Sequence, residues 1–259
     1  IKLLHYQCVF LNKNMYQKPK ITLFIKLRLY FLNMLNFCEL VSIAVDSLKS
    51  GNIIAVPTDT VYGIAGLAQN SEAVNRLYEI KNRDCKKPIA ISVADVSDVY
   101  KWGQVTVPQA LLSKLLPGPV TVVFNRTTDL NPELNPLTSL VGIRIPDHQF
   151  IREVARGCQE PLALTSANVS SAESTLRVEE FENLWPKLDR VFDDGLLGDT
   201  FHSRQGSTVV DLSKTGTYKV IRDGSPTIHC IGLKLSDDSK CELLPFNCIF
   251  LMKFSVFVL

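Results

Sequence analysis

In the middle of the chain, apolar residues recur with two different periods. One helical face is formed by residues three or four positions apart, namely Ala73, Val74, Leu77 and Ile80. Ser71 is suited to cap this helix. Similar helices are predicted at 41–49, 108–116, 148–156 and 178–185. Short apolar runs bounded by turn residues predict buried strands instead, at 53–56, 88–93, 120–124, 140–145, 162–165, 191–193, 207–212 and 218–222.

Strands and helices alternate along 41–228, and this stretch then closes with strands. The order predicts an α/β fold, a mixed and twisted open sheet with flanking helices. No internal repeat or low-complexity linker divides the stretch, so we expect a single catalytic domain at 41–228.

The two ends of the chain differ in composition from the middle. Residues 1–40 carry six basic residues and one acid, and we expect an atypical extension, either a targeting segment or an artefact of the gene model. Lys26 and Arg28 interrupt the apolar stretch 21–35, so no stable membrane insertion is expected. Residues 229–259 form an atypical hydrophobic tail.

Composition excludes several classes of protein. The seven cysteines include no C-x-x-C, which excludes zinc knuckles and thioredoxin-like motifs. An odd and scattered set of thiols indicates a reducing compartment, so we expect a cytoplasmic protein, with a mitochondrial location as the alternative. The net charge of +2 does not mark a nucleic-acid-binding chain, so any basic surface has to be local.

A polar loop follows the first predicted strand. Residues 57–63, PTDTVYG, offer two hydroxyls, a carboxylate and a phenol. Open α/β sheets bind ligands where strands end in loops, so this segment is a candidate for ligand binding. The same composition also suits an ordinary polar turn.

A basic segment lies between a predicted helix and the next strand. It places four cations within seven positions, namely Lys81, Arg83, Lys86 and Lys87. Lysine supplies a mobile charge and arginine a planar fork, so the segment is suited to bind phosphate. Cations also oppose the dipole at the end of a helix, and by itself the segment fits a solvated basic loop better.

Further polar side chains accompany later strands. Ser166 and Asn168 are two positions apart in 165–171, so in an extended backbone they face the same side. Arg144 lies among apolar strand residues, where a buried charge needs water, an acid or an anionic ligand. Two prolines and a glycine fix the turn at 116–121. Each feature taken alone also suits an ordinary loop or turn.

Taken in order, these segments resemble the YrdC family of threonylcarbamoyl-adenylate synthases. The matching motifs are PTDTVYG at 57–63, K-x-R at 81–83, KP at 87–88, LPGPVT at 116–121, VGIRIPDH at 141–148, LTSANVSS at 164–171 and GSTVVDLS at 206–213. Several of them are most similar to the animal, single-domain members. The resemblance implies a twisted α/β fold of the YrdC/RibB-like type with a concave, basic cavity.

The resemblance also implies roles for individual residues. Lys81 and Arg83 would be catalytic and would bind ATP. The other residues implied to bind ATP are Lys87, Thr121, Ser166, Asn168 and Arg222. The residues implied to bind threonine are Thr58, Thr60, Arg144 and Ser207, with Arg144 taking the carboxylate. No protein ligands for a metal are implied, and some members carry histidine where this chain has Ser92.

The implied reaction joins L-threonine, bicarbonate or CO₂, and ATP into threonylcarbamoyl-AMP and pyrophosphate. We expect Mg²⁺ to arrive with ATP, and no dedicated general base, because approximation of reactants can contribute about 7–11 kcal/mol and cations stabilise the leaving group. The product would pass to a tRNA threonylcarbamoyl transferase complex that forms N6-threonylcarbamoyladenosine, and a contact of this chain with tRNA is a further expectation.

Three other functions fit parts of the sequence. A non-catalytic module for double-stranded RNA or tRNA would also use a basic concave surface, although the aromatic motif of an RRM is absent. Carbamoyl transfer in hydrogenase maturation uses YrdC-like domains too, but together with C-x-x-C pairs that this chain lacks. A serine hydrolase fits poorly, because no G-x-S-x-G occurs and His148 has no evident partner.

Overall fold

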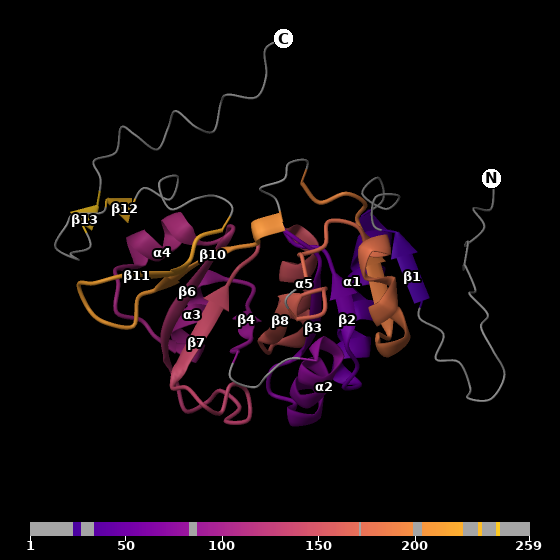
Figure 1. Cartoon of the computed structure of the whole chain (residues 1–259), viewed down its shortest axis with the longest axis horizontal. Helices are drawn as coiled ribbons and strands as arrows, with labels where there is room; N and C mark the ends of the chain where they lie inside the picture. Colours follow the sequence, from indigo (N-terminus) through magenta and orange to yellow (C-terminus); the bar gives the residue numbers. More distant parts are fainter. Residues whose placement is uncertain are drawn as a thin grey trace, which may run out of the picture.

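The computed structural model describes residues 34–82, 87–170, 172–198 and 204–224, together with three short strands at 23–26, 233–234 and 242–243. Its centre is an eleven-stranded sheet (Figure 1). Ten strands follow one another in the order β1 (Leu23–Lys26), β9 (Arg190–Asp193), β2 (Ile54–Val56), β3 (Gly63–Leu67), β8 (Leu162–Ser166), β4 (Ala90–Ser92), β7 (Leu140–Arg144), β6 (Val120–Arg126), β10 (Thr208–Asp211) and β11 (Lys219–Arg222).

Strand direction in this sheet is mixed. The parallel pairs are β1 with β9, β2 with β9, β4 with β7, and β6 with β10. The other neighbours are antiparallel, including β5 (Gly103–Gln104), which pairs with β6. Strands β12 (Leu233–Lys234) and β13 (Glu242–Leu243) form a separate antiparallel pair.

The described part of the chain contains six helices, namely α1 (Met34–Lys49), α2 (Ser71–Lys81), α3 (Val96–Trp102), α4 (Gln109–Leu115), α5 (Gln149–Cys158) and the 3₁₀ helix η1 (Val178–Lys187). Helices α1 and α5 pack with Leu162 and Leu164 of β8 in one apolar cluster. The other helices share a second cluster with Ile91, Val122 and Ile143, whose side chains alternate along the strands with those of the first face.

Because side chains alternate between the two faces of the sheet, the strands can pack against helices on one face and line a cavity on the other. In β7, Val141 and Ile143 pack into the second cluster, whereas Gly142 and Arg144 face the opposite side. On that side α1 and α5 pack against β2, β3 and β8, while β6 and β7 present Thr121, Gly142 and Arg144 to a cavity. The cavity therefore occupies part of the sheet face that these two helices leave open.

The predicted fold class is confirmed, and the differences are local. Strand β3 was not predicted, because its sequence GIAGL lacks the β-branched run typical of strands. Close packing favours glycine at position 66, since a Cβ there would lie 2.6 Å from Cδ1 of Ile53. Helix α3 was also missed; it is short, and the Asp98 carboxylate accepts a hydrogen bond from the Asp95 N–H at 3.0 Å.

Other boundaries shift by a few residues. Helix α1 begins at Met34 rather than at 41, and Asn70 rather than Ser71 caps α2 by accepting from the Ala73 N–H. Apart from β1, the start of α1, β12 and β13, the predictions for 1–40 and 229–259 lie outside the described residues. Among the residues described, no helix combines the length and apolarity needed to cross a membrane.

Candidate active site

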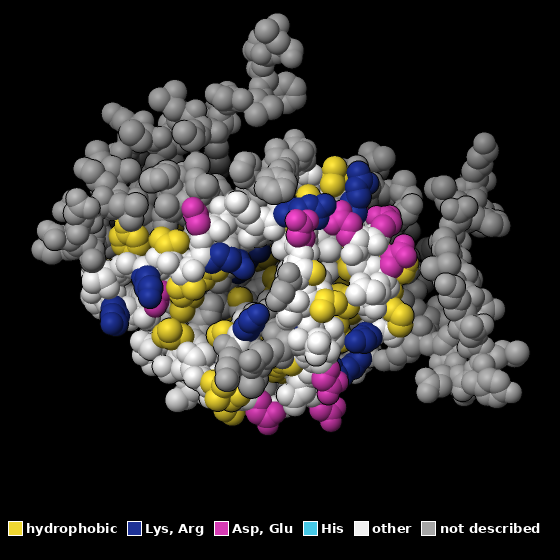
Figure 2. Space-filling view, in the orientation of Figure 1, with side chains coloured by type: hydrophobic (Ala, Val, Ile, Leu, Met, Phe, Trp, Pro, Cys, Tyr) yellow, Lys and Arg dark blue, Asp and Glu magenta, His cyan; other side chains and the backbone are white. Residues whose placement is uncertain are grey.

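A cavity of about 370 Å³ lies on the open part of the sheet, within the size range of small-molecule sites. Its apolar wall includes Ala90, Val123, Leu140, Leu164 and Val209. In Figure 2 this face of the molecule is hollowed near its middle, with Lys and Arg side chains beside the hollow. The apolar wall supplies a surface against which a flat organic group can lie.

The charged residues that line the cavity are both cations. Arg144 and Arg222 contribute to the lining, and no Asp or Glu among the described residues does so. Low-dielectric walls concentrate the field of such charges, so the cavity attracts anions. The sequence-based expectation of a concave, basic cavity therefore agrees with the described lining.

The 57–63 loop forms one end of the cavity. The Thr58 hydroxyl accepts hydrogen bonds from the backbone N–H groups of Thr60 at 3.1 Å and Val61 at 3.2 Å, and donates to the Val61 carbonyl at 2.8 Å. These bonds within the turn fix the backbone. Thr58 lines the cavity, whereas Thr60 does not, and its hydroxyl accepts from Arg144 Nη2 at 2.9 Å.

Arg144 is held beside this loop by β7. Its residue surface is only 7% exposed, and burial lowers the pKa of its guanidinium while the Asp59 carboxylate opposes that shift. Nη2 donates to Asp59 Oδ1 as well as to Thr60. The strand register places Arg144 between Thr121 of β6 and Ser92 of β4. The Ser92 hydroxyl is buried and has no partner among the described residues.

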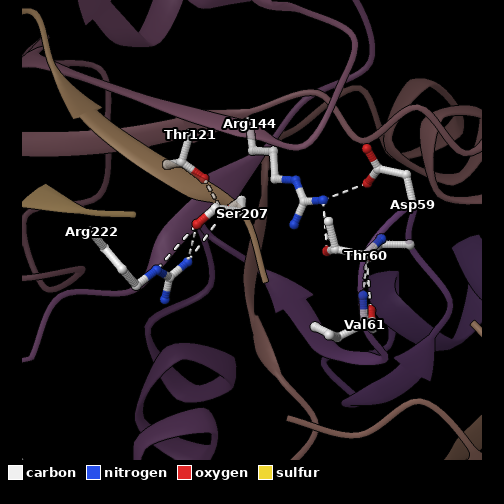
Figure 3. A network of polar contacts seen from close by, with 8 residues as sticks. Asp59, Thr60, Val61, Thr121, Arg144, Ser207 and Arg222 are labelled. Carbon is white, nitrogen blue, oxygen red and sulfur yellow. Dashed lines mark hydrogen bonds and ion pairs between the residues drawn. The ribbon is translucent and has the colours of Figure 1, made fainter. Parts of the chain in front are cut away.

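A second polar group lies on the other side of Thr121. The Thr121 and Ser207 hydroxyls are 2.8 Å apart, and Arg222 Nη2 donates to the Ser207 carbonyl at 2.7 Å and lies 3.2 Å from its hydroxyl. Figure 3 shows Arg222 and Arg144 on opposite sides of the Thr121–Ser207 pair. Chain segments more than 80 residues apart thus meet along one wall.

Lys81 lies against Ser166 and Asn168, two residues that the family resemblance places in the same site. Its Nζ donates to the backbone carbonyls of Ser166 and Asn168, each at 2.5 Å, and to Asn168 Oδ1 at 3.0 Å. The side chain is 1% exposed, and of the three residues only Ser166 lines the cavity. In this structure the ammonium of Lys81 therefore holds the 166–168 loop in place and does not face the cavity.

Two further cations were predicted at this end of the site. Arg83 lies outside the described residues. Lys87 is exposed and does not contribute to the cavity lining, although its neighbour Pro88 does.

The sequence analysis missed the contacts that hold the 57–63 loop through Tyr62. The Tyr62 hydroxyl donates to the Gly195 carbonyl at 2.8 Å and accepts from the Asp194 N–H at 2.9 Å. Burial of the phenol raises the pKa of Tyr62, so it remains neutral. His148 was expected to lack a partner, but its Nε2 lies 3.3 Å from Asp194 Oδ2. His148 is also the N-cap residue of α5, which confirms its predicted place at a helix start.

Comparison with known proteins identifies the relatives of this arrangement. The Sua5–YciO–YrdC family model, described as "Telomere recombination", matches residues 46–224. The human protein named threonylcarbamoyl-AMP synthase is 51% identical over 188 residues, which cover 72% of this chain and 67% of the human one.

Solved structures share the fold. MTH1692 from Methanobacterium thermoautotrophicum is 30% identical with a TM-score of 0.55, covering 76% of this chain and 92% of that one. Sua5 from P. abyssi, in a structure complexed with L-threonine, is 24% identical with a TM-score of 0.68, covering 87% of this chain and 63% of that one. The chain therefore belongs to the Sua5–YciO–YrdC family, among its threonylcarbamoyl-AMP synthases.

Proposed function

We propose that the cavity joins L-threonine, bicarbonate or CO₂, and ATP into threonylcarbamoyl-AMP and pyrophosphate. The observation that carries this assignment is the placement of Arg144 and Arg222 on opposite sides of the Thr121–Ser207 pair (Figure 3). Two separate cationic positions in one cavity suit two separate anions, the carboxylate of an amino acid and a polyphosphate.

The Arg144 end is proposed to bind threonine. Its guanidinium is suited to the substrate carboxylate, and the hydroxyls of Thr58 and Thr60 lie beside it. Ser207 borders this end through Thr121.

The rest of the cavity is proposed to bind ATP. Ser166 faces it from beside Gly63 of the 57–63 loop, on a segment held by Lys81 and Asn168. Thr121 and Arg222 lie on the other side of Arg144 (Figure 3). The sequence adds Arg83 and Lys87 to this set. We assign Lys81 a catalytic role in which it holds Ser166 in position. We assign Arg83 the role of stabilising negative charge on the phosphates.

The reaction then depends mainly on alignment. One oxygen of the carbamate formed from threonine and CO₂ attacks the α-phosphorus, a P–O bond forms, and the bond to pyrophosphate breaks. Held reactants contribute much of the barrier reduction, and cationic side chains stabilise the charge that moves to pyrophosphate. No general base is needed at this step, because the carbamate oxygen already carries a negative charge.

The lining suits a Mg²⁺ ion that arrives with the nucleotide. Mg²⁺ prefers carboxylate and phosphate oxygens, and the described lining offers hydroxyls of Thr121 and Ser207 but no carboxylate. No cluster of three His, Cys, Asp or Glu side chains occurs in the described residues. We therefore assign the ion to the triphosphate oxygens, where it would neutralise charge on the leaving group.

An RNA-binding role explains the cavity less well, because a volume of about 370 Å³ is too small for a duplex. The product is proposed to pass to a tRNA threonylcarbamoyl transferase complex, with any contact between this chain and tRNA on the outer surface. The scattered cysteines support a cytoplasmic location for this reaction. Residues 41–228 are proposed as the catalytic domain.

The test uses the full chain with ATP, bicarbonate and Mg²⁺, with and without L-threonine. We expect pyrophosphate release that depends on threonine, together with the mixed anhydride detected by mass. Release that is indifferent to threonine would overturn the proposal.

Two sets of variants test the two ends. Arg144→Met should abolish the pyrophosphate release that depends on threonine. The surface control Arg156→Met, which removes an exposed partner of Asp95, should retain that release. Replacing both Lys81 and Arg83 by Met should abolish turnover, and near-normal turnover would contradict the assignment of the ATP end.

A further inference from the structure

Asp59 lies next to the cavity without lining it. Its Oδ1 accepts from Arg144 Nη2, and the two side chains are only 11% and 8% exposed. Within the described residues, Asp59 is the acid paired with Arg144. The second carboxylate oxygen of Asp59 is buried and has no partner there.

The position of this carboxylate is set by its own loop. The Thr58 hydroxyl bonds to the backbone on the far side of Asp59, at Thr60 and Val61. Thr60 also accepts from the same nitrogen of Arg144 that contacts Asp59. The rigid turn therefore presents two acceptors to one nitrogen of a longer and more flexible side chain.

Counting donors shows which part of Arg144 remains available. A guanidinium has five N–H donors, and both donors of Nη2 are directed to Asp59 and Thr60. Among the described residues, Nε is buried without a partner and Nη1 makes no hydrogen bond, and Figure 3 shows Nη1 turned away from Asp59. The cavity is thus offered Nη1, in an orientation that the 57–63 loop fixes.

The charge of Asp59 has a second effect. A carboxylate paired with Arg144 offsets the positive charge at this end of the cavity. A polyphosphate carries several negative charges and is repelled more strongly by Asp59 than the single carboxylate of an amino acid. The pair therefore accepts a carboxylate and disfavours a phosphate chain.

We propose that Asp59 is a positioning and specificity-determining residue, which orients Arg144 and reserves it for the carboxylate of the amino-acid substrate against the phosphates of ATP. This role rests on the proposed function, because it concerns the same two substrates. It assigns to Asp59 no contact with a reacting atom.

The experiment compares the full-length wild type with Asp59→Ala, Asp59→Asn and the control Asp95→Asn, which alters an Asp–Arg pair on the surface. Threonylcarbamoyl-AMP is measured by chromatography. Asp59→Ala should raise the KM for threonine about tenfold or more, with the KM for ATP within about twofold, since it affects only one of the two ends. The control should leave both constants unchanged.

Asp59→Asn separates orientation from charge, because the amide oxygen can still accept from Nη2. It should keep the KM for threonine within about threefold of wild type. Tripolyphosphate, added as a probe, should compete with threonine in this variant but not in the wild type. If the KM for threonine is unchanged in Asp59→Ala, Asp59 does not orient Arg144. If tripolyphosphate does not compete with threonine in Asp59→Asn, Asp59 does not reserve Arg144 for the carboxylate.

A wild type without threonine-dependent product would contradict the proposed function itself. Isothermal titration calorimetry of L-threonine with the wild type and each variant, without ATP, measures threonine binding separately from the overall reaction. It therefore tests the role of Asp59 independently of the proposed function. A weaker affinity in Asp59→Ala alone supports the positioning role, and equal affinities in all four proteins contradict it. Thermal unfolding of each variant shows whether the changes in KM accompany a folded protein.

Discussion

The Nζ atom of Lys81 lies 3.0 Å from Oδ1 of Asn168, although 87 positions separate the two residues. The same ammonium donates to the backbone carbonyls of Ser166 and Asn168. Helix α2, which ends at Lys81, is thereby fastened to the loop after β8. The motif suggested that Lys81 binds phosphate. In this structure Lys81 instead holds the segment that contains Ser166 in place through hydrogen bonds.

Replacing Lys81 by Met tests this linkage. The change would leave the part-buried carbonyl of Ser166 and the buried carbonyl of Asn168 without this donor, and an unsatisfied buried acceptor costs about 1–3 kcal/mol. We expect the free energy of unfolding to fall by at least about 2 kcal/mol, with loss of product formation. Urea denaturation measures the first effect. Lys187→Met, at an exposed position, is the control, and an unchanged urea midpoint for Lys81→Met would contradict the linkage.

Ser207, which borders the threonine end, and Arg222, which is proposed to bind ATP, should act as one unit in catalysis. Arg222 contacts both the carbonyl and the hydroxyl of Ser207, so removal of either side chain alters the contacts of the other. A double-mutant cycle of Ser207→Ala with Arg222→Ala, measured on kcat/KM for ATP, should give a coupling energy of about 0.5–3 kcal/mol. The same cycle with the distant Arg152→Ala should be additive. If the effects of Ser207→Ala and Arg222→Ala are also additive, the two residues act independently and the prediction is wrong.

Glu180 should contribute stability that depends on pH. Hydrogen bonds from Arg204 Nη1 at 2.6 Å and from the Leu176 N–H at 3.2 Å lower the pKa of Glu180, with the Arg204 bond as the larger cause and burial opposing it. A carboxyl whose pKa is lower in the folded state stabilises the protein above its unfolded pKa, and this contribution is lost as the pH falls through the folded pKa.

We therefore expect Glu180→Gln to be less stable than wild type at pH 7, with the gap closing below about pH 4. Urea midpoints from pH 3 to pH 7 measure this difference. Glu182→Gln, at an exposed position in the same helix, serves as the control. A gap that stays constant across this range would refute the assigned shift.

Cys158 should resist alkylation in the folded protein. Burial raises the pKa of its thiol to about 12, and the thiolate is the reactive form. Cys38 is exposed. With iodoacetamide at pH 8, peptide mapping by mass should show modification of Cys38 well before Cys158, and similar rates for both in denaturing urea. Equal rates in the native protein would show that the thiol of Cys158 is accessible.

The fold followed from local patterns wherever those patterns were strong. Helix α2 and strands β6 and β8 were predicted because apolar periodicity and turn residues agree within each segment. Strand β3 escaped prediction because close packing at Gly66, rather than β propensity, selects its small residues. That packing depends on Ile53, whose approach to Gly66 is a tertiary contact.

The site was predicted in part. Arg144 was expected to need water, an acid or an anionic ligand, and the structure pairs it with an acid. The resemblance implied that Lys81 and Ser166 belong to one site, and the two residues are in contact. The identity of that partner, Asp59, was not predicted. Aspartate in a polar turn is common, and nothing in the spacing of 57–63 indicates a contact 85 positions away.

The sequence by itself determined most of the strands and helices, the polar loops between them and the family to which the chain belongs. It did so because hydrophobic period and turn chemistry act over a few neighbouring residues. Only the tertiary structure decided which nitrogen of Arg144 faces the cavity and which oxygens hold Lys81. Those choices depend on strand register and on hydrogen bonds between distant segments, which form only when the sheet is assembled.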